Sequence, residues 1–243
     1  MEHFDKEFCL EVWGPLACFT RPEFKVERVS YEVITPSAAR AIFESIFWKP
    51  AIHWQVTKIE VLKPIKWTNI RRNEVKATAK LDPKSLTPSV SELYIDGEKG
   101  FRDQRNTLLL KDVHYRIWAK LEFIPTWKRK DTRNPLIDAE EADLLRRDEN
   151  PGKYNAMFER RARKGQCFNT PYLGCREFSA YWKFVDMLEE QMEHPLKEVP
   201  EGNKDFGLMF YDWDYSDNIQ AQFYPALMEN GIIVVDKTKV KKL

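Results

Sequence analysis

The sequence lacks a strong charge of either sign. Its 39 lysines and arginines are balanced by 38 aspartates and glutamates, which leaves the 243 residues with a formal net charge of +1. A marked excess of basic residues is typical of domains that bind nucleic acid over a broad face. Any RNA-binding site in this chain must therefore come from local clusters of basic residues.

Cysteine is scarce, and the apolar runs are short. The four cysteines form no CxxC pair and have no histidine at zinc-binding spacing. No apolar run approaches the length of a membrane-spanning helix, and we expect no signal peptide. These features predict a cytoplasmic protein with reduced thiols, without a cofactor and without a membrane partner.

Aromatic residues, in contrast, are abundant. The chain has 15 phenylalanines, 9 tyrosines and 8 tryptophans, and 43% of its residues are apolar. This composition is sufficient for the core of one large domain, or of one medium domain with a smaller one attached. Aromatic side chains serve packing first, but they also suit base stacking.

Three segments of the first half are predicted to be strands. Residues 7–13 alternate between two faces, and residues 113–123 alternate apolar side chains with mostly polar ones. Residues 51–65 change parity in the middle, which predicts a bulge near Thr57 and Lys58. Between these strands, the polar residues 67–107 are predicted to form a long loop insertion.

Two helices have clear sequence signals. Thr35 is a candidate N-cap with Pro36 at the first helical position, and Pro50 limits the helix that follows. Pro151 begins the second helix, and Gly165 is a suitable C-terminal stop. The charged residues between the last predicted strand and Pro151 are predicted to be a connector or a short helix.

The remaining segments complete an α+β prediction. Residues 167–178 suggest a short strand and turn, so that the order becomes βαββαβ, the ferredoxin-like arrangement that also underlies RNA-recognition modules. A short helical stretch at 181–192 is predicted to precede three strands within 206–236. We therefore expect a ferredoxin-like domain over 1–178 and a small C-terminal antiparallel sheet over 179–243.

Several segments, taken in order, resemble one known family. They are GPLACFTRPEFKVERVSYEVITPSAARAIFESIFWKPAI, LKPIKWTNIRRNEV, LLLKDVHYRIWAKLEF, RRARKGQCFNTPYLGCREF and, in the tail, FGLMFYDWDY with GIIVVD. Together they span most of the chain. The chain resembles the CRISPR-associated Cas-five RNA-binding family, subtype I-C.

The resemblance implies a function. Such proteins bind the stem-loop of the CRISPR repeat RNA, cut at the base of the stem without a metal ion, and hold the 5′ handle of the guide RNA within the interference complex. The ribose 2′-hydroxyl attacks the adjacent phosphate, so the reaction needs a proton acceptor, a proton donor and cationic charge on the phosphorane. An alternative within the family is a subunit that binds the handle without cutting.

The resemblance also implies catalytic positions. The family's nucleases use a tyrosine at the end of the first helix, with a lysine and a histidine near the third strand. These positions match Phe47, Lys111 and His114. A phenyl ring transfers no proton, so the role of the tyrosine is lost or has moved, with Tyr31 and Tyr115 as possible substitutes. A regular strand would place Lys111 and His114 on opposite faces, which requires a bulge or a late strand start.

Basic and aromatic side chains provide RNA-binding candidates. The candidates are loop cations, the basic end of the second helix and an aromatic residue on a polar strand face: Arg21, Lys25, Arg28, Arg71, Arg72, Arg160, Arg161, Arg163, Lys164 and Trp118. The alternative for the cations is a solvated surface or, at the helix end, favourable interaction with the helix dipole. Trp48 and Trp67 are further stacking candidates, although core packing is the preferred interpretation of Trp48.

One pair of carboxylates allows a metal hypothesis. Asp212 and Asp214 alternate in a predicted strand and have the residue type that divalent cations prefer. We give this reading little weight, and we predict no resident metal. An unrelated ferredoxin-like protein without an RNA role is the remaining alternative.

Overall fold

The computed structural model describes residues 6–75, 102–125, 128–129, 149–186, 202–215 and 219–242. Its helices are α1 (Pro36–Ile46), α3 (Pro151–Arg163) and the short 3-10 helix η4 (Lys237–Lys239). Its strands are β1 (Glu7–Ala17), β2 (Ile52–Val61), β3 (Trp67–Val75), β4 (Arg102–Phe123), β5 (Tyr181–Val185), β6 (Asn203–Asp214), β7 (Gln220–Glu229), β8 (Ile232–Val234) and β9 (Lys241–Lys242). All belong to one antiparallel sheet, in the order β5-β1-β4-β2-β8-β7-β6, with β3 paired to β4 and β9 to β7.

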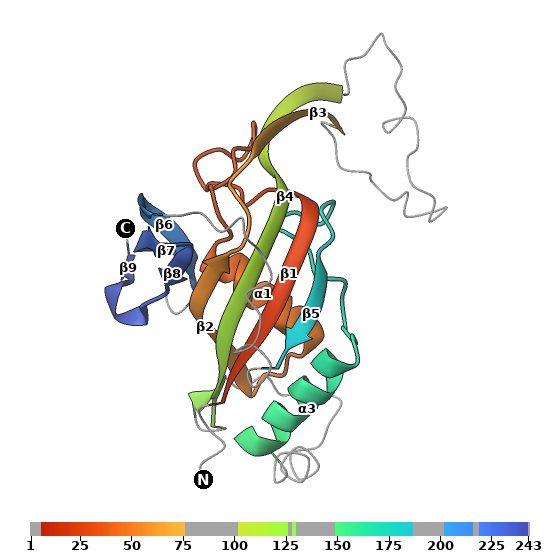
Figure 1. Cartoon of the computed structure of the whole chain (residues 1–243), viewed down its shortest axis with the longest axis vertical. Helices are drawn as coiled ribbons and strands as arrows, with labels where there is room; N and C mark the ends of the chain where they lie inside the picture. Colours follow the sequence, from red (N-terminus) through yellow and green to blue (C-terminus); the bar gives the residue numbers. More distant parts are fainter. Residues whose placement is uncertain are drawn as a thin grey trace, which may run out of the picture.

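The helices α1 and α3 cover one face of this sheet (Figure 1). Side chains of alternate residues in β1, such as Phe8, Leu10 and Val12, are buried on this face. The ring of Phe8 lies 4.8 Å from that of Phe158 in α3, which in turn stacks on Phe43 of α1 at 5.6 Å. The predicted strands 7–13 and 113–123 are confirmed as parts of the longer β1 and β4.

The predicted start of α1 is confirmed. The hydroxyl of Thr35 accepts a hydrogen bond from the backbone N–H of Ala38 at 3.3 Å, and Pro36 is the first helical residue. The helix ends at Ile46, before Pro50 is reached, because Phe47 adopts an extended backbone. The indole N–H of Trp54 donates to the carbonyl oxygen of Phe47 at 3.0 Å and holds that turn.

The predicted bulge and the predicted second helix are also confirmed. The pairing of β2 with β4 shifts register between Val56 and Lys58. In α3, the side chain of Asn150 accepts a hydrogen bond from the N–H of Lys153 at 2.7 Å. Gly165 follows the helix with a φ of +64°, a left-handed conformation that glycine adopts without a Cβ clash.

The prediction of a long loop over 67–107 is wrong at both of its ends. Residues 67–75 form β3, which pairs with the first part of β4 from Trp67 opposite Leu110 to Val75 opposite Arg102. These two strands extend beyond the rest of the sheet (Figure 1), so no continuous apolar face marks them in the sequence. The part of the predicted loop at 76–101 lies outside the described residues.

The helical prediction for 181–192 is wrong over residues 181–185. These residues form β5, which pairs with β1 from Cys9 opposite Val185 to Trp13 opposite Tyr181. Tertiary pairing decides the conformation of this short aromatic segment. The predicted strand within 167–178 is instead a loop with one bridge, between Tyr172 and Ser179. Residues 187–192 lie outside the described part of the chain.

The three predicted C-terminal strands are present as β6, β7 and β8. They do not form a separate small sheet, because β8 pairs with β2 and joins them to the main sheet. The division of the chain at residue 178 stays a prediction. Within the described residues, no helix is both long and apolar enough to cross a membrane.

Candidate functional site

The three predicted catalytic positions do not meet in space. Lys111 and His114 lie opposite Leu16 and Trp13 in the middle of β4, whereas Phe47 lies near the C-terminal end of that strand. The ring of Phe47 is 5.9 Å from that of Tyr154, which is 6.2 Å from the ring of Phe123. Nine residues of strand separate His114 from Phe123, which corresponds to about 30 Å. The three predicted catalytic residues therefore belong to two separate sites, which are too far apart to act on one phosphate.

The first site, here called the histidine cluster, lies on the sheet face opposite to the helices. It consists of Glu11, Trp13, His114, Arg116, Tyr181 and Lys183, which face one another across β1, β4 and β5. Glu11 Oε1 lies 2.9 Å from Nε2 of His114, and Glu11 Oε2 accepts a hydrogen bond from Nε of Arg116 at 3.2 Å. The ammonium of Lys183 is 3.3 Å from Glu11 Oε1. Trp13 lies between the rings of His114 and Tyr181, at 5.6 and 6.1 Å.

The ionised carboxylate of Glu11 determines which ring nitrogen of His114 carries a hydrogen. Burial opposes ionisation of this carboxyl, but hydrogen bonds from His114 and Arg116 and the charges of Lys183 and His114 outweigh burial and lower the pKa of Glu11 to about 2. The carboxylate can only accept hydrogen bonds, so Nε2 of His114 carries the hydrogen. Nδ1 is then the atom with which His114 could accept a proton.

An irregular backbone separates Lys111 from His114. Asp112 between them has a φ of +54°, a left-handed conformation that interrupts the alternation of side chains along β4. Lys111 is exposed, whereas Val113 is buried. Asp112 pairs with Lys63 at 2.6 Å. The backbone irregularity that the sequence required between Lys111 and His114 is therefore present.

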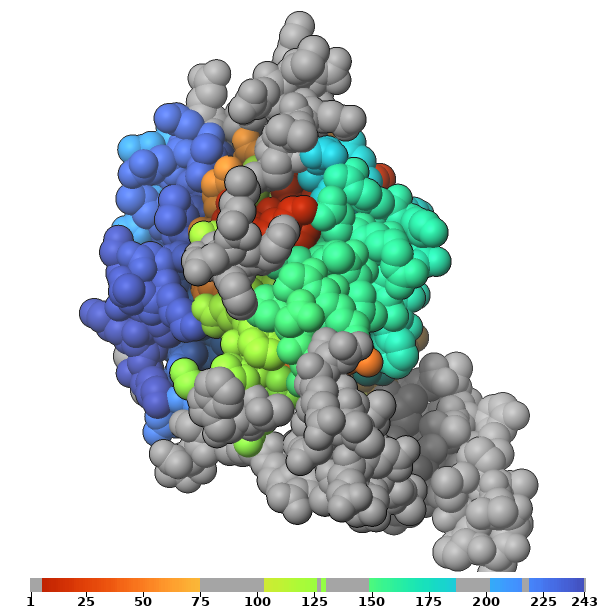
Figure 2. All heavy atoms as spheres, turned by 90° about the horizontal axis from the view of Figure 1, so that it is seen from below, coloured from red at the N-terminus to blue at the C-terminus, as the bar shows by residue number. Residues whose placement is uncertain are grey.

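The second site, here called the phenol cluster, surrounds Phe47. It consists of Phe47, Arg129, Glu149, Tyr154 and Arg161, and it extends along α3 from the first turn, with Tyr154, to the last turn, with Arg161. The guanidinium carbon of Arg161 lies 5.3 Å from the centre of the Phe47 ring, and Arg161 donates to the carbonyl oxygen of Ile46 at 3.2 Å. Arg129 pairs with Glu149 at 2.7 Å. Seen from below, α3 lies beside the end of β4 (Figure 2).

The phenol cluster combines a proton donor with positive charge. Burial, a hydrogen bond with Glu149 and the negative charge of Glu149 raise the pKa of Tyr154 to about 12, so its hydroxyl stays protonated. Nη2 of Arg129 is buried without a hydrogen-bond partner among the described residues. Lys153 is exposed in the first turn of α3, where the helix dipole is positive. This arrangement suits a phosphate group and a leaving oxygen that needs a proton.

The tyrosines proposed as substitutes for the position of Phe47 have other contacts. Tyr31 and Tyr115 are buried in the core. The hydroxyl of Tyr31 accepts a hydrogen bond from the N–H of Phe210 at 3.3 Å, and the hydroxyl of Tyr115 bonds to the backbone of Ile34. The tyrosine whose ring contacts Phe47 is instead Tyr154.

The loop cations of the sequence prediction fall into two groups. Arg28 and Arg72 converge on Glu177, each at 3.4 Å, and Arg28 also donates to the sulfur of Cys175 at 3.2 Å. Arg21 lies over the ring of Tyr31 at 4.4 Å. Lys25 and Arg71 are exposed. The exposed pair, Lys25 and Arg71, is therefore better placed to contact a phosphate backbone than the three arginines with intramolecular contacts.

The four cations at the basic end of α3 also include some with intramolecular contacts and some that are exposed. Arg163 pairs with Asp186 at 2.6 Å and with Glu159, and Arg161 belongs to the phenol cluster. Arg160 and Lys164 are exposed. The four cations that the sequence grouped together thus include two with structural contacts and two on the surface.

The structure reverses the expected exposure of two tryptophans, Trp118 and Trp48. Trp118 is only 1% exposed, and the ammonium of Lys58 lies 3.5 Å from its ring centre, so it offers no open face for a base. Trp48, for which core packing was preferred, is 56% exposed. The reason is the early end of α1 at Ile46, which turns Trp48 out of the helical stripe.

The two carboxylates of the metal hypothesis face cations instead. Arg40 of α1 donates to both oxygens of Asp212, at 2.9 and 3.0 Å. Asp214 pairs with Lys242 at 2.5 Å. Within the described residues, no group of three or more histidine, cysteine, aspartate or glutamate side chains has the arrangement of a metal site.

Most residues of these sites were missed as functional candidates from the sequence, and Glu11, Tyr154 and Tyr181 illustrate why. Glu11 occupies the polar face of the first predicted strand, and that position was its only signal. Tyr154 is on the apolar face of its helix, so the sequence pattern indicated packing. Tyr181 lies in the segment predicted to be helical, which hid its pairing with Trp13.

The chain is similar to a protein family and to two named relatives that agree with one another. A family model described as "CRISPR-associated protein (Cas_Cas5)" matches residues 8–236. A relative from Mannheimia succiniciproducens named "CRISPR pre-crRNA endoribonuclease Cas5d" is 42% identical over 231 residues, 93% of each chain. A relative of the same name from Thermus thermophilus is 40% identical over 205 residues, 84% of this chain and 71% of the relative.

The fold is also shared with solved structures. One described as "Crystal Structure of CRISPR-associated Protein" superposes with a TM-score of 0.62 at 24% identity, over 95% of this chain and 92% of the other. A functionally uncharacterized protein from Streptococcus mutans superposes with a TM-score of 0.61 at 22% identity, over the same shares. At this level of identity, the likeness concerns the fold alone.

Proposed function

Because this chain belongs to the CRISPR-associated Cas5 family, we propose that it is an endoribonuclease that cuts CRISPR repeat RNA at the base of its stem-loop. The observation that carries this proposal is the 42% identity, over 93% of both chains, with a relative named as a pre-crRNA endoribonuclease. An identity of this extent includes the segments that hold both candidate sites.

The ferredoxin-like arrangement is part of the proposal. The elements β1, α1, β2, β4, α3 and β5 follow one another in the order βαββαβ, with β3 as an addition before β4. In the sheet, these four strands are neighbours in the order β5-β1-β4-β2. We assign this unit as the RNA-binding core and the strands β6 to β9 as an extension of it.

The proposed reaction needs no metal ion. The 2′-oxygen of a ribose attacks the adjacent phosphorus, and the bond from phosphorus to the 5′-oxygen breaks. The proton of the 2′-hydroxyl passes to a base, and an acid gives a proton to the departing 5′-oxygen. The products are a 2′,3′-cyclic phosphate and a 5′-hydroxyl. Cationic groups stabilise the charge that accumulates on the phosphorane.

We place this reaction at the phenol cluster. The resemblance puts the family's tyrosine at Phe47, and the ring of Tyr154, whose hydroxyl is protonated, lies 5.9 Å from the ring at that position. Tyr154 would donate the proton to the 5′-oxygen. Lys153, Arg129 and the N-terminus of α3 would hold the phosphate.

Lys111 and His114 remain the competing assignment. The histidine cluster has a possible base in Nδ1 of His114 and cations in Arg116 and Lys183. However, the carboxylate of Glu11 already binds all three of these neighbours, and the ring of His114 stacks against Trp13. These contacts favour a role in joining β1, β4 and β5.

The proposed partners are repeat RNA and the other subunits of the type I-C interference complex, in the cytoplasm. After cutting, the protein would keep the 5′ handle of the guide RNA. The exposed cations Lys25 and Arg71 would contact the phosphate backbone of that RNA, beside Arg28 and Arg72, which are paired with Glu177.

A second candidate is a subunit that binds the handle without cutting. Phe47 favours it, because this buried ring occupies the position of the family's tyrosine and transfers no proton. Incubation of the purified protein with repeat RNA and a chelator separates the two functions. Cleavage supports the endoribonuclease, and tight binding of intact RNA supports the second candidate.

A further inference from the structure

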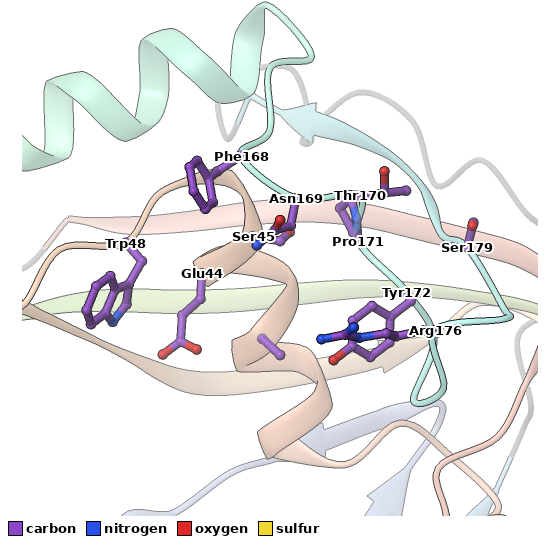
Figure 3. Close-up of a pocket in the computed structure, with 11 residues that line it drawn as sticks. Glu44, Ser45, Trp48, Phe168, Asn169, Thr170, Pro171, Tyr172, Arg176 and Ser179 are labelled. Carbon is purple, nitrogen blue, oxygen red and sulfur yellow. The ribbon is translucent and has the colours of Figure 1, made fainter. Parts of the chain in front are cut away.

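A groove of about 620 Å³ lies between α1 and the loop that follows α3, and its lining shares no residue with either cluster (Figure 3). Its lining includes Trp48 and Phe168, together with Tyr172 and Arg176 from the same loop as Phe168. Figure 3 shows Trp48 and Phe168 near one end of the groove and Tyr172 with Arg176 near the other. We call this feature the aromatic groove.

The aromatic side chains of the groove are exposed. Trp48 is 56%, Phe168 81% and Tyr172 36% accessible to solvent. Single exposed aromatic residues are common, but three in one concave site form an apolar surface that marks an interaction site. Each ring presents a planar face, which is the shape that stacks on a nucleobase.

Backbone hydrogen bonds hold the groove in place without a ligand. The N–H groups of Phe168 and Asn169 both donate to the carbonyl oxygen of Ser45, at 2.7 and 3.2 Å. The bridge between Tyr172 and Ser179 fixes the other end of the loop. A preformed site loses less conformational entropy when it binds a ligand.

Positive charge lies beside the aromatic rings. Arg176 lines the groove and is exposed. Arg161 donates to the carbonyl oxygen of Ile46, which brings the basic end of α3, with the exposed Arg160 and Lys164, next to the last turn of α1. The acidic lining residue Glu44 is paired at 2.5 Å with Arg40, which it shares with Asp212.

We propose that the aromatic groove binds unpaired nucleotides of the repeat RNA. Bases stack on Trp48 and Phe168, while Arg176, Arg160 and Lys164 contact the phosphates. The combination of flat aromatic faces with cations distinguishes this ligand from an apolar peptide, which needs no cations. The inference rests on the proposed function and adds to it a site for the single-stranded part of the substrate.

The test compares two RNAs. One is the repeat RNA of the host's own array with its single-stranded flanks, and the other is its stem-loop alone. The variants Trp48→Ala and Phe168→Ala are measured against wild type and against Tyr215→Ala, an exposed aromatic residue outside the groove. Circular dichroism establishes that each variant is folded. Repeat RNA carrying 4-thiouridine in its flanks is also crosslinked to the wild-type protein.

The expected result is a selective loss. Trp48→Ala and Phe168→Ala weaken binding of the flanked RNA by about 5- to 150-fold each, the range of a lost stacking contact, and leave binding of the stem-loop alone and the Tyr215→Ala control unchanged. Crosslinks fall on residues 41–49 or 167–176. Equal affinities of wild type and both groove variants for the flanked RNA would overturn the groove proposal while the proposed function stands. If the wild type binds neither RNA, the proposed function itself fails.

Discussion

The rings of Phe47 and Tyr154 lie 5.9 Å apart, at an angle of 45°. Phe47 stands where the family resemblance implies a tyrosine, and Tyr154 brings a phenol to the same place from another helix. A hydroxyl that is lost from the end of α1 can thus be supplied by the first turn of α3.

Tyr154→Phe is expected to slow cleavage of repeat RNA by about 100-fold or more, the range of a lost general acid. The ring and its packing remain, so RNA binding should stay within about twofold. Single-turnover cleavage rates and binding constants measure both quantities. Tyr224→Phe is the matched control, because Tyr224 is also a buried tyrosine but lies in β7.

The same assay decides between the two clusters. If Tyr154→Phe cuts at the wild-type rate while His114→Ala or Lys111→Ala abolishes cleavage and retains binding, the reaction belongs to the histidine cluster. The placement at the phenol cluster would then be wrong, although the endoribonuclease proposal would stand.

Phe47→Tyr should rescue the Tyr154→Phe variant. The new hydroxyl enters the same cluster, beside Arg161, whose guanidinium carbon is 5.3 Å from the ring centre of residue 47. We expect the double variant to recover at least a tenth of the wild-type cleavage rate. A double variant as slow as Tyr154→Phe alone contradicts the idea that one phenol can replace the other.

Much of the fold could be predicted from the sequence. Thr35 and Asn150 with their following prolines mark both helix starts, and the alternation in β1 and β4 gives the central strands. The early end of α1 could not be predicted, since it depends on the hydrogen bond from Trp54 to the carbonyl oxygen of Phe47. Likewise β5 is a strand because β1 offers it an edge, a fact that its own residues do not show.

The sites were less predictable than the fold. Sequence spacing could not show that Phe47 lies near the C-terminal end of β4, whereas His114 lies in the middle of this strand. It also could not show that Tyr154, on an apolar helix stripe, touches Phe47. Residues distant in the sequence form both clusters: pairing of β1 with β4 and β5 assembles the histidine cluster, and packing of α3 on the sheet brings Tyr154 to Phe47.

Glu11 should make stability depend on pH. Its folded pKa of about 2 lies below its usual value of 4.5, so its stabilising effect is complete above pH 4.5 and is lost as pH falls towards 2. Glu11→Gln should therefore lower the free energy of unfolding at pH 7 by up to about 3 kcal/mol. Urea unfolding at pH 7 and near pH 2.5 measures this difference.

The control for this experiment is Glu27→Gln, which changes an exposed glutamate in the loop after β1. Its effect should be small at both pH values. A loss of stability in Glu11→Gln that is as large near pH 2.5 as at pH 7 would show that the charge of Glu11 is not its cause.

The exposed cations Lys25, in the loop after β1, and Arg71, in β3, should contribute to the salt dependence of RNA binding. Lys25→Glu combined with Arg71→Glu removes two groups that are free to approach phosphates. We expect weaker binding and a slope of log affinity against log salt that is shallower by about 1 to 2. Lys241→Glu, on the exposed strand β9, is the control. An unchanged slope would mean that these two residues are solvated surface charges.

We predict that the protein by itself cuts repeat RNA without a metal ion. The most direct measurement is incubation of the purified protein with repeat RNA in excess EDTA, followed by analysis of the ends of the products. We predict a cut at the base of the stem-loop that leaves a 5′-hydroxyl on one fragment and a 2′,3′-cyclic phosphate on the other. RNA that is bound but intact, or cleavage only after Mg²⁺ is added, would contradict the account.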